Sequence, residues 1–361
     1  MKRVLILSNH SFMLWQFRRE LIASMIASDM EVTVGVPFGE HVDDFRDLGC
    51  KMINIPVDRR GINPVRDLSL LRQYLQILRS MKPDMVVTYS IKPNVYAGFS
   101  CRLLKIPYCV NVQGLGTAFQ KPVISTLVTW MYRIACKKAK AVFFENTGNA
   151  EYFRNRKVVA ARQQVVLPGA GINLQHHPLQ SYPANDPIRF LFLGRLMQEK
   201  GIGELFAATK MLYDDCFDIR LDLVGFFEDA YKDQVQQLCD LGIARFHGFQ
   251  ADPRPFYAAA DCVVLPSYHE GMSNVLLEAA ATGRPLITSR IPGCREAVEE
   301  GISGFTCPVR DTAGLYEAMK RMANLPRQQR MEMGLAGRAR MKAIFDKQIV
   351  VDATMKAIFQ E

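Results

Sequence analysis

The chain alternates short apolar runs, rich in β-branched residues, with longer stretches in which apolar and polar residues recur at helical spacing. In the first half, strands are expected at Val4–Leu7, Val32–Val36, Met52–Ile55, Met85–Thr88, Tyr108–Val112 and Ala141–Phe144. Helices are expected at Trp15–Ser28, Val65–Ser80, Val95–Leu104, Val123–Cys136 and Ala150–Val158. Such alternation predicts a parallel sheet that is covered by helices on both faces.

The same pattern restarts after a break at residues 168–187, a Pro- and Gly-rich segment that indicates an interdomain linker. Further strands are expected at Arg189–Leu193, Asp218–Val224, Cys262–Leu265 and Pro285–Thr288. Helices are expected at Gly203–Leu212, Ala230–Leu241, Asn274–Thr282 and Thr312–Met322, with a helical tail over Pro326–Phe359. We therefore predict two Rossmann-like doubly wound domains at residues 1–170 and 187–345, joined by a linker at 171–186. A tail helix at 346–361 is expected to cross back to the first domain.

Composition places the protein among ordinary folded proteins, because 49% of its 361 residues are hydrophobic and 22% are charged. The nine cysteines form no CxxC pair, which is typical of reduced thiols. The apolar run Val4–Leu7 is too short for a signal peptide, and no stretch reaches the roughly 18 apolar residues of a membrane span. We therefore expect a cytoplasmic protein.

The positive charge is concentrated in the first half of the chain. Residues 1–180 hold 24 Lys and Arg against 12 Asp and Glu, a net charge of +12, although the whole chain carries only +9. This asymmetry suggests an anionic partner, which charge alone leaves open as nucleic acid, an anionic membrane or a phosphorylated substrate. The alternative is a surface of solvated basic side chains.

Open parallel sheets bind ligands at the carboxyl ends of their strands, so the loops after strands are the first places to search. The loop GRLMQEKG, residues 194–201, follows the first strand of the second domain. Arg195 and Lys200 stand there beside a helix expected to start near Gly201, and a helix N-terminus favours an anion. With Gly194, they form a candidate diphosphate cradle; the alternative is an ordinary charged turn.

A second loop lies within PSYHEGMSNVLLEAAATGRP, residues 266–285. A helix is expected to begin at Asn274 with Ser273 or Asn274 as its cap. Free N–H groups would then be offered to a phosphate by Gly271, Met272, Ser273 and Asn274. Glu270, in the loop, is a candidate acceptor for sugar hydroxyls, and Glu278, in the helix, for a ribose. Glu278 lies in the apolar run VLLEAAA, where an unpaired charge is costly, and this favours a binding role over a solvated position.

Three loops of the first domain supply candidate acceptor contacts. They are Asn9 and His10 in SNHSF, Lys92 and Asn94 in TYSIKPNVYAG, and Gln113 and Gly114 in NVQGLGTAF. Lys92 stands where a helix is expected to begin, and Gly114 and Gly116 permit close backbone approach. A lone loop histidine such as His10 is more often simply solvated.

The chain lacks two sequence patterns, one typical of metal-dependent nucleotide binding and one typical of dinucleotide binding. A D-x-D triplet, which often holds a metal-bound nucleotide diphosphate, does not occur, so we expect no metal and no cofactor. The absence of GxGxxG argues against a dinucleotide-binding site.

The run GRLMQEKG followed by HEGMSNVLLEAAATGRP, with Gly293 and Glu296 beyond it, resembles the retaining glycosyltransferases of family four, which have the GT-B fold. The spacing from Glu270 to Glu278 is similar to that family's E-x7-E signature. The resemblance implies that Arg195 and Lys200 hold the donor diphosphate, that Glu278 binds the ribose, and that Glu270 binds donor-sugar hydroxyls near the reacting carbon. Arg195, Lys200 and Glu270 are the residues for which it implies a catalytic role.

IKPNVYAG and VQGLG also resemble a narrower group of bacterial transferases that extend undecaprenyl-diphosphate-linked sugars. The resemblance implies a UDP-sugar donor, with an N-acetylhexosamine as the transferred sugar, and a lipid-linked acceptor at the inner face of the cytoplasmic membrane. An anionic membrane surface would attract the basic first half, and residues 122–140 are either an interfacial helix or a core helix with a basic end. Nucleic acid is not expected as a partner. Two positions depart from the family: SNHSF lacks the common Gly-Gly, and Gln113 replaces a common histidine.

Three alternatives remain open. They are a transferase with a soluble acceptor, a GT-B sugar-nucleotide epimerase that needs no acceptor, and a binding subunit without catalysis. The intact set of Arg195, Lys200, Glu270 and Glu278 argues against the last.

Overall fold

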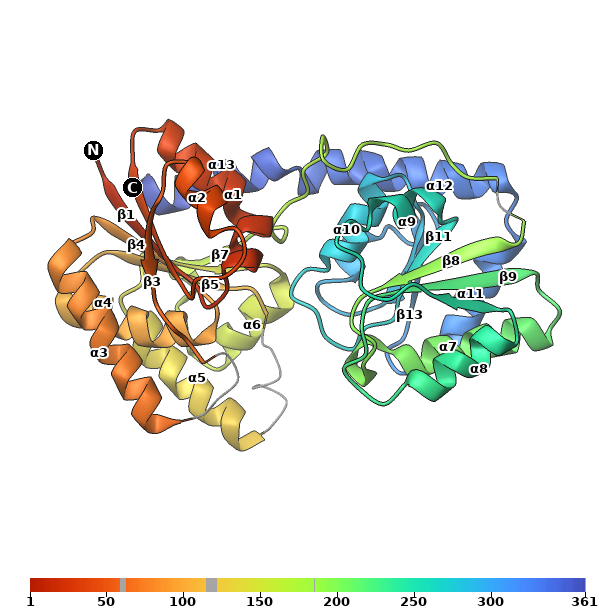
Figure 1. Ribbon diagram of the computed structural model, residues 1–361, viewed down its shortest axis with the longest axis horizontal. Helices are drawn as coiled ribbons and strands as arrows, with labels where there is room; N and C mark the ends of the chain where they lie inside the picture. Colours follow the sequence, from red (N-terminus) through yellow and green to blue (C-terminus); the bar gives the residue numbers. More distant parts are fainter. Residues whose placement is uncertain (59–62, 115–121, 185, 361) are drawn as a thin grey trace. The chain divides into compact units, whose positions relative to one another are not determined.

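The computed structural model describes residues 1–58, 63–114, 122–184 and 186–360, and Figure 1 shows its elements. Contacts divide the chain into a first unit, Met1–Ala170 with Gln348–Glu361, and a second unit, Gly171–Lys347. Each unit is built around one parallel sheet, as the alternation of apolar runs and amphipathic stretches predicts.

The first unit has a seven-stranded sheet in the order β3-β2-β1-β4-β5-β6-β7. The strands are β1 (Arg3–Leu7), β2 (Glu31–Val36), β3 (Lys51–Asn54), β4 (Met85–Tyr89), β5 (Tyr108–Val112), β6 (Ala141–Phe144) and β7 (Gln164–Val166). The helices are α1 (Ser11–Ala27), α2 (Val42–Asp47), α3 (Pro64–Met81), α4 (Gly98–Leu104), α5 (Pro122–Cys136) and α6 (Thr147–Asn155), and a π-helical turn at Pro93–Ala97 precedes α4.

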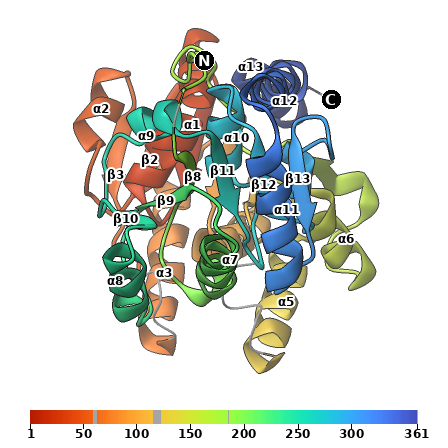
Figure 2. The same ribbon diagram turned by 90° about the vertical axis from the view of Figure 1, so that its right-hand side faces the viewer.

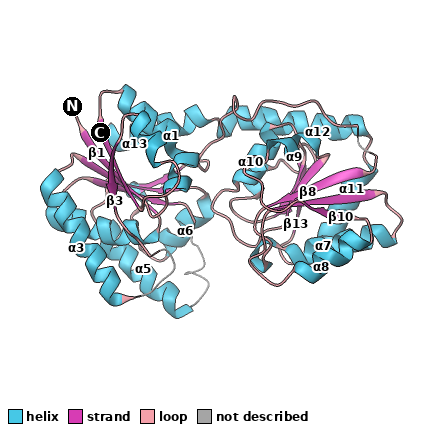
Figure 3. Ribbon diagram, viewed as in Figure 1, coloured by secondary structure: helices cyan, strands magenta, loops and turns pink. Residues whose placement is uncertain are grey.

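Alternating strand residues of the first unit feed two separate cores, one on each face of the sheet. Leu5 and Leu7 pack with α3, α4, α5 and α6, whereas Val4 and Ile6 pack with α1, α2 and the last helix, α13 (Lys347–Phe359). The period of two along β1 therefore places a helical layer on each face. Figure 3 shows these helices on the two sides of the strands.

The second unit has a six-stranded sheet in the order β10-β9-β8-β11-β12-β13. The strands are β8 (Ile188–Leu193), β9 (Ile219–Val224), β10 (Ala244–Phe246), β11 (Cys262–Leu265), β12 (Leu286–Ser289) and β13 (Gly304–Cys307). The helices are α7 (Ile202–Asp214), α8 (Lys232–Asp240), α9 (Arg254–Ala259), α10 (Asn274–Ala281), α11 (Thr312–Asn324) and α12 (Arg327–Arg340). Helices α7, α8 and α11 cover one face, and α9, α10 and α12 cover the other (Figures 1 and 2).

Several features differ from the sequence-based expectation, among them the six-residue helices α2 and α9, which were not predicted. The expected helical tail is not continuous: Asp346 adopts an extended conformation, and its neighbours bond to Ile172, with Ile172 N donating to Phe345 O and Lys347 N to Ile172 O. This β-bridge replaces helical hydrogen bonds and separates α12 from α13. The strands β7, β10 and β13 were not predicted. The first two have only three residues each, too few to show a period, and β13 has the sequence GFTC, which lacks a run of β-branched apolar residues.

Candidate active site

The loops after β8 and β11 lie side by side because these strands are neighbours in the second sheet. Tyr268 N donates to Glu199 O at 2.8 Å, which joins the two loops directly. Gly201 has a φ of +69°, and a Cβ there would lie 2.1 Å from Pro266 O, so only glycine permits this approach. The predicted phosphate loop and the predicted sugar loop are therefore in direct contact at the carboxyl ends of β8 and β11.

Lys200 and Glu270 form an ion pair where the two loops meet. Lys200 Nζ donates to Glu270 Oε1 at 2.5 Å, and Ser267 Oγ donates to the same oxygen at 2.8 Å. The side chains are only 18% and 14% exposed. The cation predicted to hold a diphosphate and the carboxylate predicted to hold a sugar are thus direct partners, and Ser267 is a third member that the sequence did not reveal.

Arg195 occupies a more open position in the same loop. Its guanidinium donates to Glu228 Oε2 at 2.6 Å, and its side chain is 42% exposed. Glu228 follows β9, the strand on the other side of β8, and only the strand order brings it here. A surface pair of this kind contributes about 0–1 kcal/mol, so Arg195 can exchange Glu228 for another anion at little cost.

The N-terminus of α10 is fixed by the neighbouring loop. Ser273, one of the two residues predicted as the cap, is the helix cap. Its Oγ accepts from Leu276 N, and Ser273 N donates to Gly293 O at 2.9 Å. A Cβ on Gly293 would lie 2.2 Å from Gly271 O, and Gly293 N donates to Glu296 Oε2 at 2.7 Å. These contacts fix the backbone of residues 271–274, which leads into the first turn of α10, and Met272 within it is buried.

Glu278 is buried within α10, with only 8% of the residue exposed. Its Oε2 accepts a hydrogen bond of 2.9 Å from the hydroxyl of Tyr257 on α9. Burial raises the pKa of Glu278 to about 7, against the lowering effects of the Tyr257 hydrogen bond and the charge of Lys347. The sequence indicated that this carboxylate needs a partner, but nothing in the sequence identified Tyr257.

Asn9 and His10 line a pocket of about 260 Å³ in the first unit. The pocket lies after β1 and β2, at the carboxyl ends of two paired strands, and includes Phe12 and Phe38. His10 also caps α1, with its Nδ1 accepting from Met13 N at 3.5 Å. These two predicted acceptor residues therefore share a cavity that can admit a ligand group.

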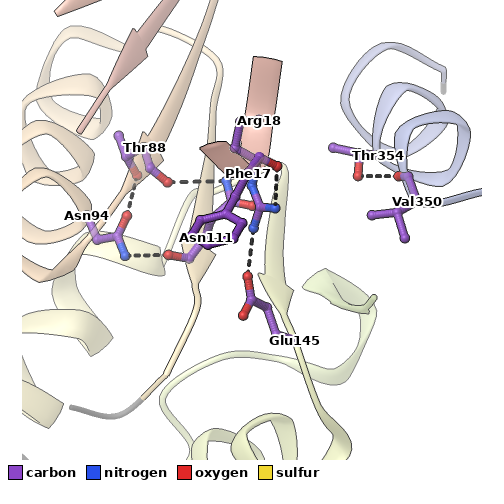
Figure 4. Close-up of polar contacts among 8 residues, drawn as sticks. All are labelled: Phe17, Arg18, Thr88, Asn94, Asn111, Glu145, Val350 and Thr354. Carbon is purple, nitrogen blue, oxygen red and sulfur yellow. Dashed lines mark hydrogen bonds and ion pairs between the residues drawn. The ribbon is translucent and has the colours of Figure 1, made fainter. Parts of the chain in front are cut away.

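Asn94 has a structural position, contrary to its predicted contact with an acceptor (Figure 4). It is 1% exposed, accepts from Thr88 Oγ1 at 2.7 Å, and donates to Asn111 O at 2.7 Å and to Tyr132 Oη at 3.2 Å. These bonds tie the turn after β4 to β5 and α5, so the amide is used for folding.

Lys92 does not stand as a free cation, because its Nζ donates to Asp67 Oδ1 at 2.7 Å and the two side chains are 15% and 14% exposed. Gln113 and Gly114 are half-buried directly after β5, and Gly116 lies outside the described residues. Within the described ranges, no group of three or more His, Cys, Asp and Glu side chains is arranged to hold a metal ion.

Two family models match the chain. One, described as glycosyl transferases group 1, covers residues 187–324, and the other, described as a glycosyl transferase 4-like domain, covers residues 14–169. The chain is 25% identical to the N,N'-diacetylbacillosaminyl-diphospho-undecaprenol alpha-1,3-N-acetylgalactosaminyltransferase of Campylobacter jejuni, over 98% of this chain and 97% of that protein. It is 24% identical to an Escherichia coli UDP-Gal:alpha-D-GlcNAc-diphosphoundecaprenol alpha-1,3-galactosyltransferase, over 78% of this chain and 77% of that one.

Solved structures bear out the predicted fold. The crystal structure of Anabaena HepE in complex with UDP superposes with a TM-score of 0.80 and 18% identity, covering 99% of each chain. Together with WaaG, at a TM-score of 0.75, it confirms GT-B as the fold class. The chain therefore belongs to the glycosyltransferases, with a 4-like domain in its first half and a group 1 domain in its second.

Proposed function

We propose that this protein is a retaining glycosyltransferase that moves an N-acetylhexosamine from a UDP-sugar onto an undecaprenyl-diphosphate-linked saccharide. The observation that carries the proposal is the 2.5 Å contact between Lys200 Nζ and Glu270 Oε1, at the carboxyl ends of the central strands β8 and β11. A diphosphate and the sugar attached to it are adjacent groups, so their binding residues must also be adjacent. The Lys200–Glu270 contact meets this requirement.

The donor would bind mainly by replacing carboxylates that now pair with the basic side chains of the site. The diphosphate would take Arg195 from its exposed pair with Glu228 and would share Lys200 with Glu270. Ser273 N, which was predicted to donate to a phosphate, is already bonded to Gly293 O, and Leu276 N is bonded to Ser273 Oγ. The other amides at the start of α10, which have no acceptor within the helix, would donate to the same phosphates. Glu278 would accept hydrogen bonds from the ribose.

Transfer would proceed on one face of the donor sugar. The bond between the anomeric carbon and the phosphate oxygen breaks, and its electron pair stays on the phosphate. The acceptor oxygen bonds to the same face of that carbon, and its proton passes to the leaving phosphate oxygen. Lys200 and Arg195 would stabilise the growing negative charge, which is the contribution that a preorganised site makes without a metal.

The lipid-linked acceptor is supported by the two relatives whose names specify undecaprenol-linked substrates and which align with most of this chain. The pocket at Asn9 and His10 offers polar groups beside the apolar rings of Phe12 and Phe38. We assign the acceptor saccharide to this region of the first unit.

Helix α5 supports a peripheral position at the inner face of the cytoplasmic membrane. Tyr132 packs in the core, whereas Leu127 and Trp130 are 52% and 57% exposed on another face of the same helix. Arg133 is exposed farther along the same helix, and Lys137 is exposed directly after the helix ends at Cys136. An apolar stripe with Trp and adjacent cations is the composition of an interfacial helix. No helix in the described part of the chain is long and apolar enough to cross a bilayer.

The test is UDP release from a panel of UDP-sugars, with and without undecaprenyl-diphosphate-linked saccharides in detergent. Release that requires both the lipid and UDP-N-acetylhexosamine is the expected result. Release without any lipid would favour a soluble acceptor or an epimerase, and no release with any UDP-sugar would refute the assigned donor. The anomeric configuration of the product, read from its NMR coupling constants, tests retention.

A further inference from the structure

Tyr257 is a core residue, and its hydroxyl is the only group that distinguishes it from a phenylalanine at the same place. The residue is completely buried and packs among apolar side chains of the second unit. A buried hydroxyl is costly unless it is bonded, and here it donates to Glu278 Oε2 at 2.9 Å. The hydroxyl therefore fixes one of the two carboxylate oxygens of Glu278.

The backbone around Tyr257 is itself held by a second buried residue. Arg284 is 0% exposed, and its guanidinium donates to Tyr257 O at 2.8 Å and to Ala258 O at 2.9 Å. These carbonyls belong to the last turn of α9, where helical donors run out; Tyr257 O accepts one further, longer bond of 3.3 Å from Ala260 N. A third bond, of 2.7 Å to Ser181 O, ties the same guanidinium to the segment before β8. Arg284 thus locks the helix that aims the Tyr257 hydroxyl.

We propose that Tyr257 is a positioning residue for nucleotide recognition, which holds the Glu278 carboxylate in one orientation toward the ribose and is itself fixed by Arg284. This inference rests on the proposed function, because it takes Glu278 as the group that binds the ribose. Neither Tyr257 nor Arg284 would touch the donor. Their effect would pass through the bond between Tyr257 Oη and Glu278 Oε2.

The hydrogen bond also favours the charged form of Glu278. Burial raises the pKa of this carboxyl to about 7, and the groups that face it, Tyr257 from α9 and Lys347 from the start of α13, both lower it. Without the hydroxyl, the pKa would rise further, and a larger share of Glu278 would be protonated near neutral pH. A neutral carboxyl is the weaker acceptor for a ribose diol.

The test compares the affinities of full-length variants for UDP and for 2′,3′-dideoxy-UDP, which lacks both ribose hydroxyls. Isothermal titration at pH 8 and pH 6.5 gives the ratio of the two affinities, and loss of folded protein cancels in that ratio. We expect the parent to prefer UDP by about 10- to 100-fold, the range for hydrogen bonds to a charged acceptor. For Tyr257→Phe the preference should fall at least about threefold at pH 8, and further at pH 6.5.

Two variants separate the inference from the function on which it rests. Glu278→Ala should abolish the preference for UDP, and a preference retained in that variant would refute the ribose assignment itself. A preference lost in Glu278→Ala but retained in full at both pH values in Tyr257→Phe would overturn the role of Tyr257 alone. Tyr316→Phe is the matched control, because its hydroxyl also bonds a carboxylate, Asp215, on the opposite helical layer, and it should keep the parental ratio.

Discussion

Replacing Lys200 by methionine should damage turnover and stability together, since the ammonium has two roles. It pairs with Glu270, and the two side chains are 18% and 14% exposed. Breaking a fully buried pair costs about 3–5 kcal/mol, whereas an exposed pair contributes about 0–1 kcal/mol. A pair with roughly a sixth of its surface in water lies between these limits, so Lys200→Met should lose about 2–3 kcal/mol of unfolding free energy. That corresponds to a fall in Tm of roughly 5–10 °C.

The effect on turnover has a separate cause. If Lys200 stabilises the leaving diphosphate, its loss should lower kcat by about 10²- to 10³-fold, the usual cost of removing one preorganised electrostatic contact. UDP release at saturating donor and acceptor measures kcat, and thermal unfolding measures stability. A Lys200→Met variant that kept turnover within about threefold of the parent would refute the assigned role.

A double substitution separates the two effects. Glu270→Gln combined with Lys200→Met removes the stranded carboxylate, and the amide oxygen can still accept from Ser267 Oγ. Most of the lost stability should return, while turnover stays low. Lys210→Met is the control, because the pair Lys210–Asp214 is 45% and 55% exposed, and its loss should change stability by less than about 0.5 kcal/mol. If the double variant were no more stable than Lys200→Met, the reasoning from the buried pair would be wrong.

Three further predictions follow from the charges and exposure of single residues. Arg195→Ala should lower kcat by about 10²-fold and leave the unfolding free energy within about 0.5 kcal/mol of the parent, because its pair with Glu228 is exposed; a large fall in Tm would contradict this. The pKa of Glu278 is raised from 4.5 to about 7, so the folded state binds more protons than the unfolded one between these values, and stability should fall as pH rises through that window. Glu278→Gln should remove this fall, which amounts to roughly 3 kcal/mol of unfolding free energy between pH 4.5 and pH 7, and equal pH profiles of urea unfolding in parent and variant would refute it. Trp130→Ala should weaken binding to anionic vesicles several-fold in flotation assays, with residual binding that falls steeply with salt; parental binding would argue against an interfacial role for α5.

The central strands and the long helices could be predicted from the sequence because each follows a local period. Tyr108–Val112 and Cys262–Leu265 form strands with the predicted bounds, and Ser273 caps α10. The tail was predicted as helical over Pro326–Phe359, with its last helix starting at 346, but the β-bridge between Asp346 and Ile172 could not be predicted, because the two residues are far apart in the sequence. Local pattern therefore identifies elements, but not the pairings that interrupt them.

The same division applies to the candidate site. Their positions directly after predicted strands, or in the helix that follows, placed four residues at one end of a sheet: Arg195, Lys200, Glu270 and Glu278. Their partners, however, come from elements that are distant in the sequence. Glu228 reaches Arg195 from the loop after β9, and Tyr257 reaches Glu278 from α9. For Asn94, a polar residue in a loop after a strand has the pattern of a ligand contact, and only its burial reveals a structural role.

Charges at the site are compensated before any donor arrives, and this affects how substitutions should be interpreted. Lys200 is paired with Glu270, Arg195 with Glu228, and the Glu278 carboxylate accepts from a buried hydroxyl. Donor binding would exchange partners rather than neutralise isolated charges, so the net gain from each contact is smaller than its Coulomb energy. The benefit is that the groups are oriented in advance, as electrostatic catalysis requires. At Lys200 and Glu278, where the side chains are largely buried, a single substitution perturbs folding and binding at once. Only paired changes, or a change in a partner that does not touch the donor, such as Tyr257→Phe, separate the two effects.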